Sequence, residues 1–329
     1  MIPDTVTSIG YHAFYKCDNL GEVKIGAKVA TVGYRAFFAD GNLTKVTFGS
    51  SVTEIQQQAF QNCVNLQNFE LPASIQYLRY RCFAGCNKAL TEVTIPTNKD
   101  ELETELGQGV FSGCTKLATV TLGDTVKALT GPEINSNGAY VNSNSKNGLF
   151  YGCTSLKTIN WGKSVKTIGN VAFLGCSALE KVEIPDTVTS IGYQAFYECD
   201  NLGEVKIGAK VATIGSRAFF ADGNLMKVTF GSSVTEIQQQ AFQDCVNLQN
   251  FELPASIQYL RYRCFAGCNK ALTEVTIPTN KDELETELGQ GVFSGCSKLT
   301  TVTLGDTVKT LPGPRFTSGA GYSSGEYMD

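Results

Sequence analysis

The chain has 329 residues, with 27 Lys and Arg against 31 Asp and Glu, which gives a formal net charge of −4 at pH 7. This weakly acidic balance argues against nucleic acid or an anionic membrane as the partner. No stretch approaches the length of a transmembrane helix and no signal peptide precedes Ile2, so no membrane insertion is expected.

A tandem duplication dominates the chain. Residues 2–132 (the first copy) recur as residues 184–314 (the second copy), and only ten of these 131 aligned positions differ. Repeat arrays grow in this way because each unit needs only its neighbours, whereas a catalytic domain is rarely copied within one array. We therefore predict a single solenoid over residues 1–329, with a loop insert at 130–148 and an irregular tail at 312–329.

Smaller units of about 23 residues lie inside the duplication, each opening on an apolar residue followed by Pro or Gly. In chain order, about 13 units begin at Ile2, Ile25, Phe48, Leu71, Ile95, Leu122, Trp161, Ile184, Ile207, Phe230, Leu253, Ile277 and Leu304. The fifth and sixth units are expanded, to 27 and 39 residues. The chain starts directly on a repeat without a polar capping unit, so we expect a fragment or processed form of a longer protein.

Each unit carries a strand pattern and a turn pattern. In the unit 184–206, the segment Leu202-x-x-Val205-x-Ile207 ends in the alternation of a strand with one buried face. A second short extended stretch is expected at 188–191. Between them, Ala195-Phe196 followed by Cys199 suits about one helical turn. Stacked units then form one long parallel sheet, with short helices or turns on the other face.

Two columns of identical residues support this stacking. One slot holds Phe14, Phe37, Phe60, Phe83, Phe111, Phe150, Phe173, Phe196, Phe219, Phe242, Phe265 and Phe293. Three residues later, a second slot holds Cys17, Cys63, Cys86, Cys114, Cys153, Cys176, Cys199, Cys245, Cys268 and Cys296. Asp40 and Asp222 replace Cys in the second unit of each copy.

The motif Ile-Pro-Asp-Thr-Val-Thr-Ser-Ile-Gly-Tyr-x-Ala-Phe-Tyr-x-Cys-Asp-Asn-Leu at 184–202 resembles the BspA-type leucine-rich repeat, and its spacing recurs in most units. The resemblance implies a right-handed leucine-rich-repeat solenoid, which we assign to the α/β class. It also implies a secreted or cell-surface protein of host-associated microbes. Several members are described as adhesins for host matrix proteins, and the family has no shared catalytic residues to carry over.

The cysteines are predicted to be free thiols, because those of one column lie about one strand spacing apart and the slot tolerates Asp. Cys82 and Cys86, like Cys264 and Cys268, have the spacing of a metal-ligand pair, but two further ligands are not evident. We therefore predict no disulfide framework, no metal and no other cofactor.

Catalysis is not expected. His12 is the only histidine and its duplicate is Gln194, so a histidine-based site would exist at most once. Glu70 and Glu92 lie on adjacent predicted strands, but their neighbours are Lys, Thr and Asn, with no evident pocket to raise a pKa. We interpret these acidic residues as part of a solvated face.

The candidate binding surface lies on the turns rather than on the strands, whose outward positions carry no aromatic residue. Tyr and Arg are enriched at binding hot spots and recur together in the turns. The candidates are Tyr11, Tyr34, Arg35, Tyr80, Arg81, Tyr193, Arg217, Tyr262 and Arg263, with Tyr140 in the insert. The competing interpretation is that these side chains simply cover the outer turns, and the loss of Tyr34 at Ser216 favours it.

We therefore predict a non-enzymatic, extracellular or cell-surface repeat protein that binds a host protein or another surface macromolecule. The alternative is a passive stalk that presents another domain, and a glycan-binding module is a third, weaker interpretation. The insert at 130–148 is either a functional loop or a passive one. The oligomeric state is not defined by the sequence.

Overall fold

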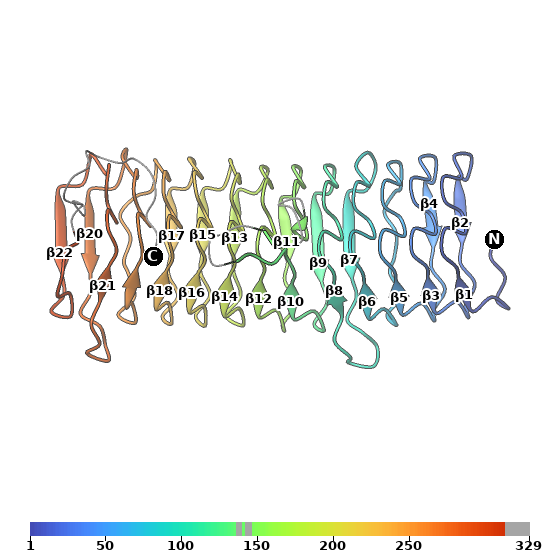
Figure 1. Ribbon diagram of the computed structural model, residues 1–329, viewed down its shortest axis with the longest axis horizontal. Helices are drawn as coiled ribbons and strands as arrows, with labels where there is room; N and C mark the ends of the chain where they lie inside the picture. The colour runs from blue at the N-terminus through green and yellow to red at the C-terminus, as the bar shows by residue number, and fades with distance from the viewer. Residues whose placement is uncertain (136–139, 142–146, 313–329) are drawn as a thin grey trace.

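The computed structural model describes residues 1–135, 140–141 and 147–312, and these residues form a long stack of similar coils (Figure 1). Each regular coil advances the chain by 23 residues, as the parallel pairing of Ser8 with Thr31 and of Thr31 with Glu54 illustrates. Strands of successive coils therefore pair in register, and the two rows of strands in Figure 1 run along the whole stack.

Two-residue strands make up the first row, the short-strand face. One sheet contains β1 (Ser8–Ile9), β3 (Thr31–Val32), β5 (Glu54–Ile55), β6 (Tyr77–Leu78) and β8 (Glu105–Leu106). The other contains β10 (Ala128–Leu129), β12 (Thr167–Ile168), β14 (Ser190–Ile191), β16 (Thr213–Ile214), β18 (Glu236–Ile237), β19 (Tyr259–Leu260) and β21 (Glu287–Leu288). β14 lies within the second extended stretch predicted at 188–191, which confirms that expectation.

Longer strands form the second row, the long-strand face. They are β2 (Glu22–Lys24), β4 (Lys45–Thr47), β7 (Glu92–Ile95), β9 (Thr119–Leu122), β11 (Thr158–Asn160), β13 (Lys181–Glu183), β15 (Glu204–Lys206), β17 (Lys227–Thr229), β20 (Glu274–Ile277) and β22 (Thr301–Leu304). β15 lies where the alternation around Val205 predicts a strand, with Val205 buried. The expected single sheet is wrong, because strands occur on two faces and each row is divided into separate sheets.

Asparagine side chains account for one kind of break in the long-strand face. Oδ1 of Asn68 accepts hydrogen bonds from the amides of Thr91 at 2.8 Å and Glu92 at 3.0 Å, and Asn250 repeats this arrangement in the second copy. The side chain thus takes the place of a backbone carbonyl in the ladder. No regular strand forms at Asn68 for this reason, although coil stacking continues.

The third side of each coil, the turn face, contains tight turns, which were one of the two predicted alternatives, and not short helices. Amides of His12, Phe14 and Lys16 donate to the carbonyls of Tyr34, Ala36 and Phe38 in the next coil. His12 and Lys16 both have φ of 55°, in the left-handed region, which directs alternate amides along the stack rather than into a helical turn. The described residues contain no α-helix, so the helical part of the α/β prediction is wrong and the fold is a parallel β-solenoid.

The core confirms both predicted columns. All twelve phenylalanine rings stack coil on coil, with centroids of neighbouring rings 5.0 to 5.9 Å apart. The twelve cysteines are free, and ten of them are buried. Nine thiols in the Cys slot donate to the carbonyl of the Phe one coil earlier, as Cys63 does to Phe37 at 3.0 Å. In these nine coils the slot therefore holds a small side chain that donates one hydrogen bond, whereas Asp40 and Asp222 fill it in two others.

Candidate binding surface

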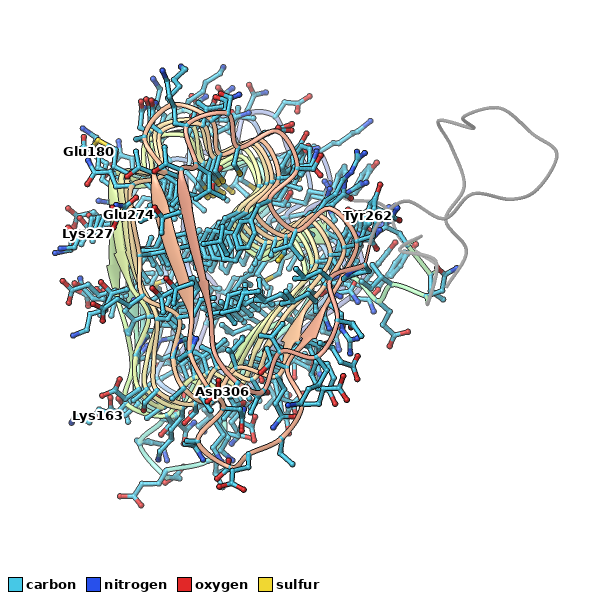
Figure 2. All side chains as sticks on the ribbon, turned by 90° about the vertical axis from the view of Figure 1, so that its left-hand side faces the viewer. Lys163, Glu180, Lys227, Tyr262, Glu274 and Asp306 are labelled. Atoms are coloured by element: carbon cyan, nitrogen blue, oxygen red, sulfur yellow. The ribbon has the colours of Figure 1, made fainter. Side chains whose placement is uncertain are left out.

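The predicted Tyr and Arg side chains lie on the turn face or on the insert beside it. In the end-on view of Figure 2, Tyr262 lies on the opposite side of the coil from Lys227 and Glu274 of the long-strand face. The long-strand face presents Glu, Lys, Thr and Asn side chains, some of them in ion pairs such as Lys227 with Glu204 at 3.1 Å. Exposed pairs of this kind contribute little stability, so this side is a solvated surface.

The most exposed aromatic group lies in the first two coils. Tyr11 is 66% exposed, and its ring stacks on Tyr34 with centroids 5.1 Å apart and on His12 at 3.8 Å. His12 in turn contacts Tyr15, at 4.5 Å between centroids. We name the group of Tyr11, His12, Tyr15, Tyr34, Arg35 and Phe38 the Tyr11 cluster.

Arg35 gives the Tyr11 cluster a fixed positive charge. Its guanidinium carbon lies 5.0 Å from the ring centroid of Tyr34 and 5.0 Å from that of Phe38. Nε of Arg35 donates to the side-chain oxygen of Gln58 at 2.8 Å, which holds the guanidinium in place between the two rings. The sequence singled out Tyr34 and Arg35, whereas Gln58 was missed because its role depends on a contact between coils. Phe38 was also missed, although it follows Arg35 by three residues in the same coil.

In the second copy, Tyr140 of the insert contacts the residues that align with Tyr11 and His12. Tyr193 aligns with Tyr11, and the ring of Tyr140 from the insert meets it edge to face, with centroids 6.2 Å apart. The Tyr140 hydroxyl donates to Oε1 of Gln194, the residue that replaces His12, at 2.9 Å. Burial raises the pKa of Tyr140 to about 12. Tyr193 is partly buried, whereas Tyr11, which lies in the first coil of this chain, is 66% exposed.

The insert also contacts the coils on its other side. The Tyr80 hydroxyl lies 3.2 Å from Oδ1 of Asn147, a residue buried at the end of the insert. Ile134 and Tyr140 form an antiparallel bridge, and the amide of Val141 donates to the carbonyl of Glu133 at 2.8 Å. Residues 136–139 and 142–146 of the predicted loop, and 313–329 of the predicted tail, lie outside the described residues. The described part of the insert thus contacts a coil that precedes its own coil in the stack and a coil that follows it.

The remaining candidates form separate groups. Arg217 donates to Gln240 at 2.9 Å and lies 5.7 Å from the ring of Phe220, while Arg263 lies 5.1 Å from the ring of Tyr262. Arg81 is half-buried next to the insert, whereas its duplicate Arg263 is exposed. The structure therefore does not bring all the candidates together, and Tyr80, Arg81 and Tyr193 are partly covered.

Charged residues on the short-strand face form a repeated cluster that the sequence analysis missed. Arg79 bonds Glu54 at 2.7 Å and Glu105 at 3.3 Å, and its guanidinium lies 4.2 Å from the ring centroid of Tyr77. Arg261 repeats these contacts in the second copy. A shallow cavity of about 420 Å³ adjoins Arg79 and the insert, and Glu103 at its edge pairs with Lys127 at 2.9 Å. These paired charges stabilise the coils without defining a catalytic group.

Two buried carboxyls lie in the cysteine column. Asp40 and Asp222 have no exposed surface, and Oδ2 of each lacks a hydrogen-bond partner. Burial raises the pKa of Asp40 to about 6, against the opposing effect of the Cys17 amide bond, and burial also raises the pKa of Asp222 well above its usual range. Neither group is accessible to a substrate, so they bear on stability rather than on binding.

Among the residues that the structure describes, no group of three or more His, Cys, Asp or Glu side chains is arranged to hold a metal ion. The same ranges contain no helix long and apolar enough to cross a bilayer. The exposed aromatic and cationic side chains of the turn face are therefore the strongest candidate site.

Comparisons with known proteins identify the repeat. The model of the BspA type leucine rich repeat region matches residues 1–117, 90–137, 128–248 and 220–320. A leucine-rich repeat protein from Bacteroides ovatus has a similar structure, with 25% identity, a TM-score of 0.54, and coverage of 90% of this chain and 82% of that one. A comparison with curated proteins finds no significant match.

Two further solved structures show more distant similarity. A leucine rich cell surface protein from Faecalibacterium prausnitzii is 25% identical, with a TM-score of 0.45, and the match covers 91% of this chain and 83% of that chain. A leucine rich repeat protein from T. pallidum is 27% identical, with a TM-score of 0.46 and coverage of 64% and 83%. Because the family match spans nearly all of the repeats, the chain belongs to the BspA type leucine rich repeat family.

Proposed function

We propose that this chain is a non-enzymatic scaffold, secreted or held at the cell surface, that binds a host protein or another surface macromolecule. The observation that carries the proposal is the Tyr11 cluster, where a 66% exposed tyrosine stacks on Tyr34 beside the fixed charge of Arg35. Family membership supports the non-enzymatic role and the surface location.

The side chains of the Tyr11 cluster need to change their conformations little in order to bind a partner. Tyr and Arg supply large contact areas and are the residues most often found at interface hot spots. Stacking and the Arg35–Gln58 hydrogen bond already restrict these side chains, so a partner orders few additional rotamers. Further weak contacts along the turn face would add to the affinity if a partner spans several coils.

A passive stalk is the second candidate, and the continuous phenylalanine column favours it. Stacked rings and coil-to-coil hydrogen bonds run through the described repeats, which suits a rigid spacer. A stalk needs no exposed aromatic cluster, so the two candidates differ in what Tyr11 contributes.

The deciding experiment is label-free binding of the purified chain to immobilised fibronectin, fibrinogen and a glycan panel at low and physiological salt. We expect saturable binding to a protein that survives physiological salt and weakens at least tenfold in the double variant Tyr11→Ala/Tyr34→Ser. Tyr259→Ala, which removes a ring from the short-strand face, is the matched control and should bind as the parent does. If the folded parent protein binds nothing in the panel, the proposal is overturned in favour of the stalk.

A further inference from the structure

The short-strand face is divided at the junction of β8 and β10, which follow one another along the stack in Figure 1. β8 is the last strand of one sheet and β10 is the first strand of the other, so no ladder joins them. The cavity of about 420 Å³ lies at this junction, and residues of both strands line it. The hydroxyl of Thr130 donates to the carbonyl of Leu106, which keeps the two coils in contact and leaves no room for an added strand.

The cavity continues along the stack as a second hollow of about 370 Å³ over β12 and β14. The two hollows share four lining residues, namely Ala128, Thr130, Gly131 and Glu133. The outward positions of β12 and β14 hold only the small side chains of Thr167 and Ser190, which leaves the second hollow open. With coils spaced by about 4.8 Å, the combined groove from β8 to β14 is about 14 Å long.

The walls of this groove are fixed by contacts within the protein. At one end, Arg79 bonds Glu54 at 2.7 Å and Glu105 at 3.3 Å. On the side of the insert, Nδ2 of Asn170 donates to the carbonyl of Pro132 at 2.9 Å. A ligand in the groove therefore needs to order few side chains, which lowers the entropic cost of binding.

The polar lining indicates a ligand that is rich in hydroxyl groups. Carboxylates, a hydroxyl, an amide and a guanidinium line the first hollow, from Arg79, Glu103, Glu105, Gln108, Thr130 and Glu133. Glu103 pairs with Lys127 and Glu105 with Arg79, so most of this charge is neutralised within the protein. Apolar ligands prefer pockets with hydrophobic and aromatic walls, whereas the described residues that line this groove include no aromatic ring.

We propose that the groove binds a short, uncharged oligosaccharide, which lies along the stack from β8 to β14. Carboxylate oxygens of Glu105 and Glu133 accept hydrogen bonds from sugar hydroxyls, and the side-chain amide of Gln108 donates one. An ion-paired carboxylate can still accept such bonds, because its two oxygens have about four lone-pair sites. This inference goes beyond the proposed function and does not depend on it, because none of the groove residues belongs to the Tyr11 cluster.

The side chain of Ala128 offers a way to fill the groove without touching the core. Ala128 lies at the outward position of β10 and lines both hollows, so Ala128→Leu places an isobutyl group in the space for the sugar. Thr31→Leu adds the same group at the outward position of β3, on the same face but outside the groove, and is the matched control. Gln108→Ala removes an amide from the lining, and Gln290→Ala makes the same change at the aligned position of the second copy.

The probes are cellotriose, maltotriose and triacetylchitotriose, with trigalacturonic acid and trilysine as charged comparators. Their binding to the full chain is measured by saturation-transfer NMR. We expect a neutral trisaccharide to bind more tightly than either charged comparator. Ala128→Leu should abolish this binding and Gln108→Ala should weaken it about tenfold. Thr31→Leu and Gln290→Ala should bind as the parent does, and circular dichroism checks that every variant is folded.

The remaining outcomes overturn the inference. It fails if none of the three neutral trisaccharides binds the folded parent, or if their binding survives Ala128→Leu. Tighter binding of trilysine that is lost in Glu133→Gln would assign the groove to a cationic ligand instead, and tighter binding of trigalacturonic acid would assign it to an anionic one. The double variant Tyr11→Ala/Tyr34→Ser should retain the trisaccharide, so failure of the proposed function and failure of this inference are separate results.

Discussion

The amide of Cys17 donates a 2.7 Å hydrogen bond to Oδ1 of Asp40 in the following coil, and Cys199 with Asp222 repeats this contact at 3.1 Å. In the next coil, the same slot holds Cys63, whose thiol donates instead of accepting. In the cysteine column, the side chain of Asp40 therefore accepts a hydrogen bond, whereas the side chain of Cys63 donates one. Its second carboxyl oxygen is left buried without a partner, and a proton on the carboxyl removes the cost of a buried charge.

The stability contributed by Asp40 and Asp222 is expected to fall as the pH rises from 4 to 7. The unfolded chain ionises its aspartates near pH 4, whereas the folded chain holds the Asp40 proton to about pH 6. A raised folded-state pKa contributes stability below the unfolded value, and that stability is lost as the pH rises through the folded value. Asp222 adds an effect of the same sign. Urea unfolding midpoints at pH 4, 5, 6 and 7 give the slope of stability against pH.

The double variant Asp40→Asn/Asp222→Asn isolates this contribution, because an amide keeps the acceptor for the Cys amide and does not titrate. We expect its midpoint to vary less with pH than that of the parent. Asp100→Asn, at an exposed aspartate that pairs with Lys99, should leave the parent slope unchanged. Identical slopes for the parent and the double variant would contradict the assignment.

The phenylalanine column gives a matched pair of core substitutions. Phe14 and Phe196 are aligned positions of the two copies, but Phe196 stacks on both Phe173 and Phe219, whereas Phe14 stacks on Phe37 alone and is partly exposed. Phe196→Ala should lower the free energy of unfolding by about 3–5 kcal/mol, and Phe14→Ala by much less. Equal losses of unfolding free energy in urea titrations would show that a ring stacked on two neighbours stabilises the protein no more than a ring stacked on one.

The reactivity of each thiol should depend on its position in the cysteine column. Burial raises the pKa of Cys176, whereas Cys296 is partly exposed. Because the thiolate is the reactive form, iodoacetamide should label Cys296 at least about tenfold faster than Cys176 in the native protein. Peptide mapping by mass spectrometry gives both rates, and all twelve thiols should react once the chain is unfolded in urea. Comparable native rates would argue against the buried column.

Replacing a glycine at a contact between coils should cost much more stability than replacing a glycine in an open turn. A Cβ atom on Gly49 would overlap the carbonyl oxygen of Gly26 in the preceding coil, whereas one on Gly41 meets nothing within 4 Å. Gly49→Ala should therefore destabilise the protein by about 2–3 kcal/mol, and Gly41→Ala by no more than about 0.5 kcal/mol. Thermal unfolding of the two variants tests this, and a tolerated Gly49→Ala would mean that the coils are free to separate locally.

The sequence was sufficient to predict the features that repeat. The 23-residue period, the Phe and Cys columns, and strands around Val205 and Ile191 all follow from residues that recur at fixed spacing. The helical turn at Ala195-Phe196 was wrong for a specific reason. Gln194 and Glu198 adopt left-handed φ of 51° and 62°, and neither is a glycine or asparagine that would have signalled it.

Features that depend on contacts between distant residues could not be predicted. Tyr140 and Gln194 are 54 residues apart, and no spacing rule links an insert to the coil that it touches. The exchange of His12 for Gln194 indicated only that a histidine-based site would exist at most once, yet in the structure the glutamine accepts a hydrogen bond from the hydroxyl of Tyr140 in the insert. Asn68 likewise looked like an ordinary outward polar residue, although its side chain replaces part of the backbone ladder.

The coil-to-coil stacking has a mechanical consequence. Each coil touches mainly its two neighbours, so tension applied between the chain ends is expected to peel the solenoid one coil at a time. A coil occupies about 4.8 Å of the stack but holds 23 residues, which reach about 80 Å when extended. A single-molecule force record should therefore show a series of similar steps, with longer ones at the two expanded units, and a protein under shear would lengthen many-fold before its chain became taut.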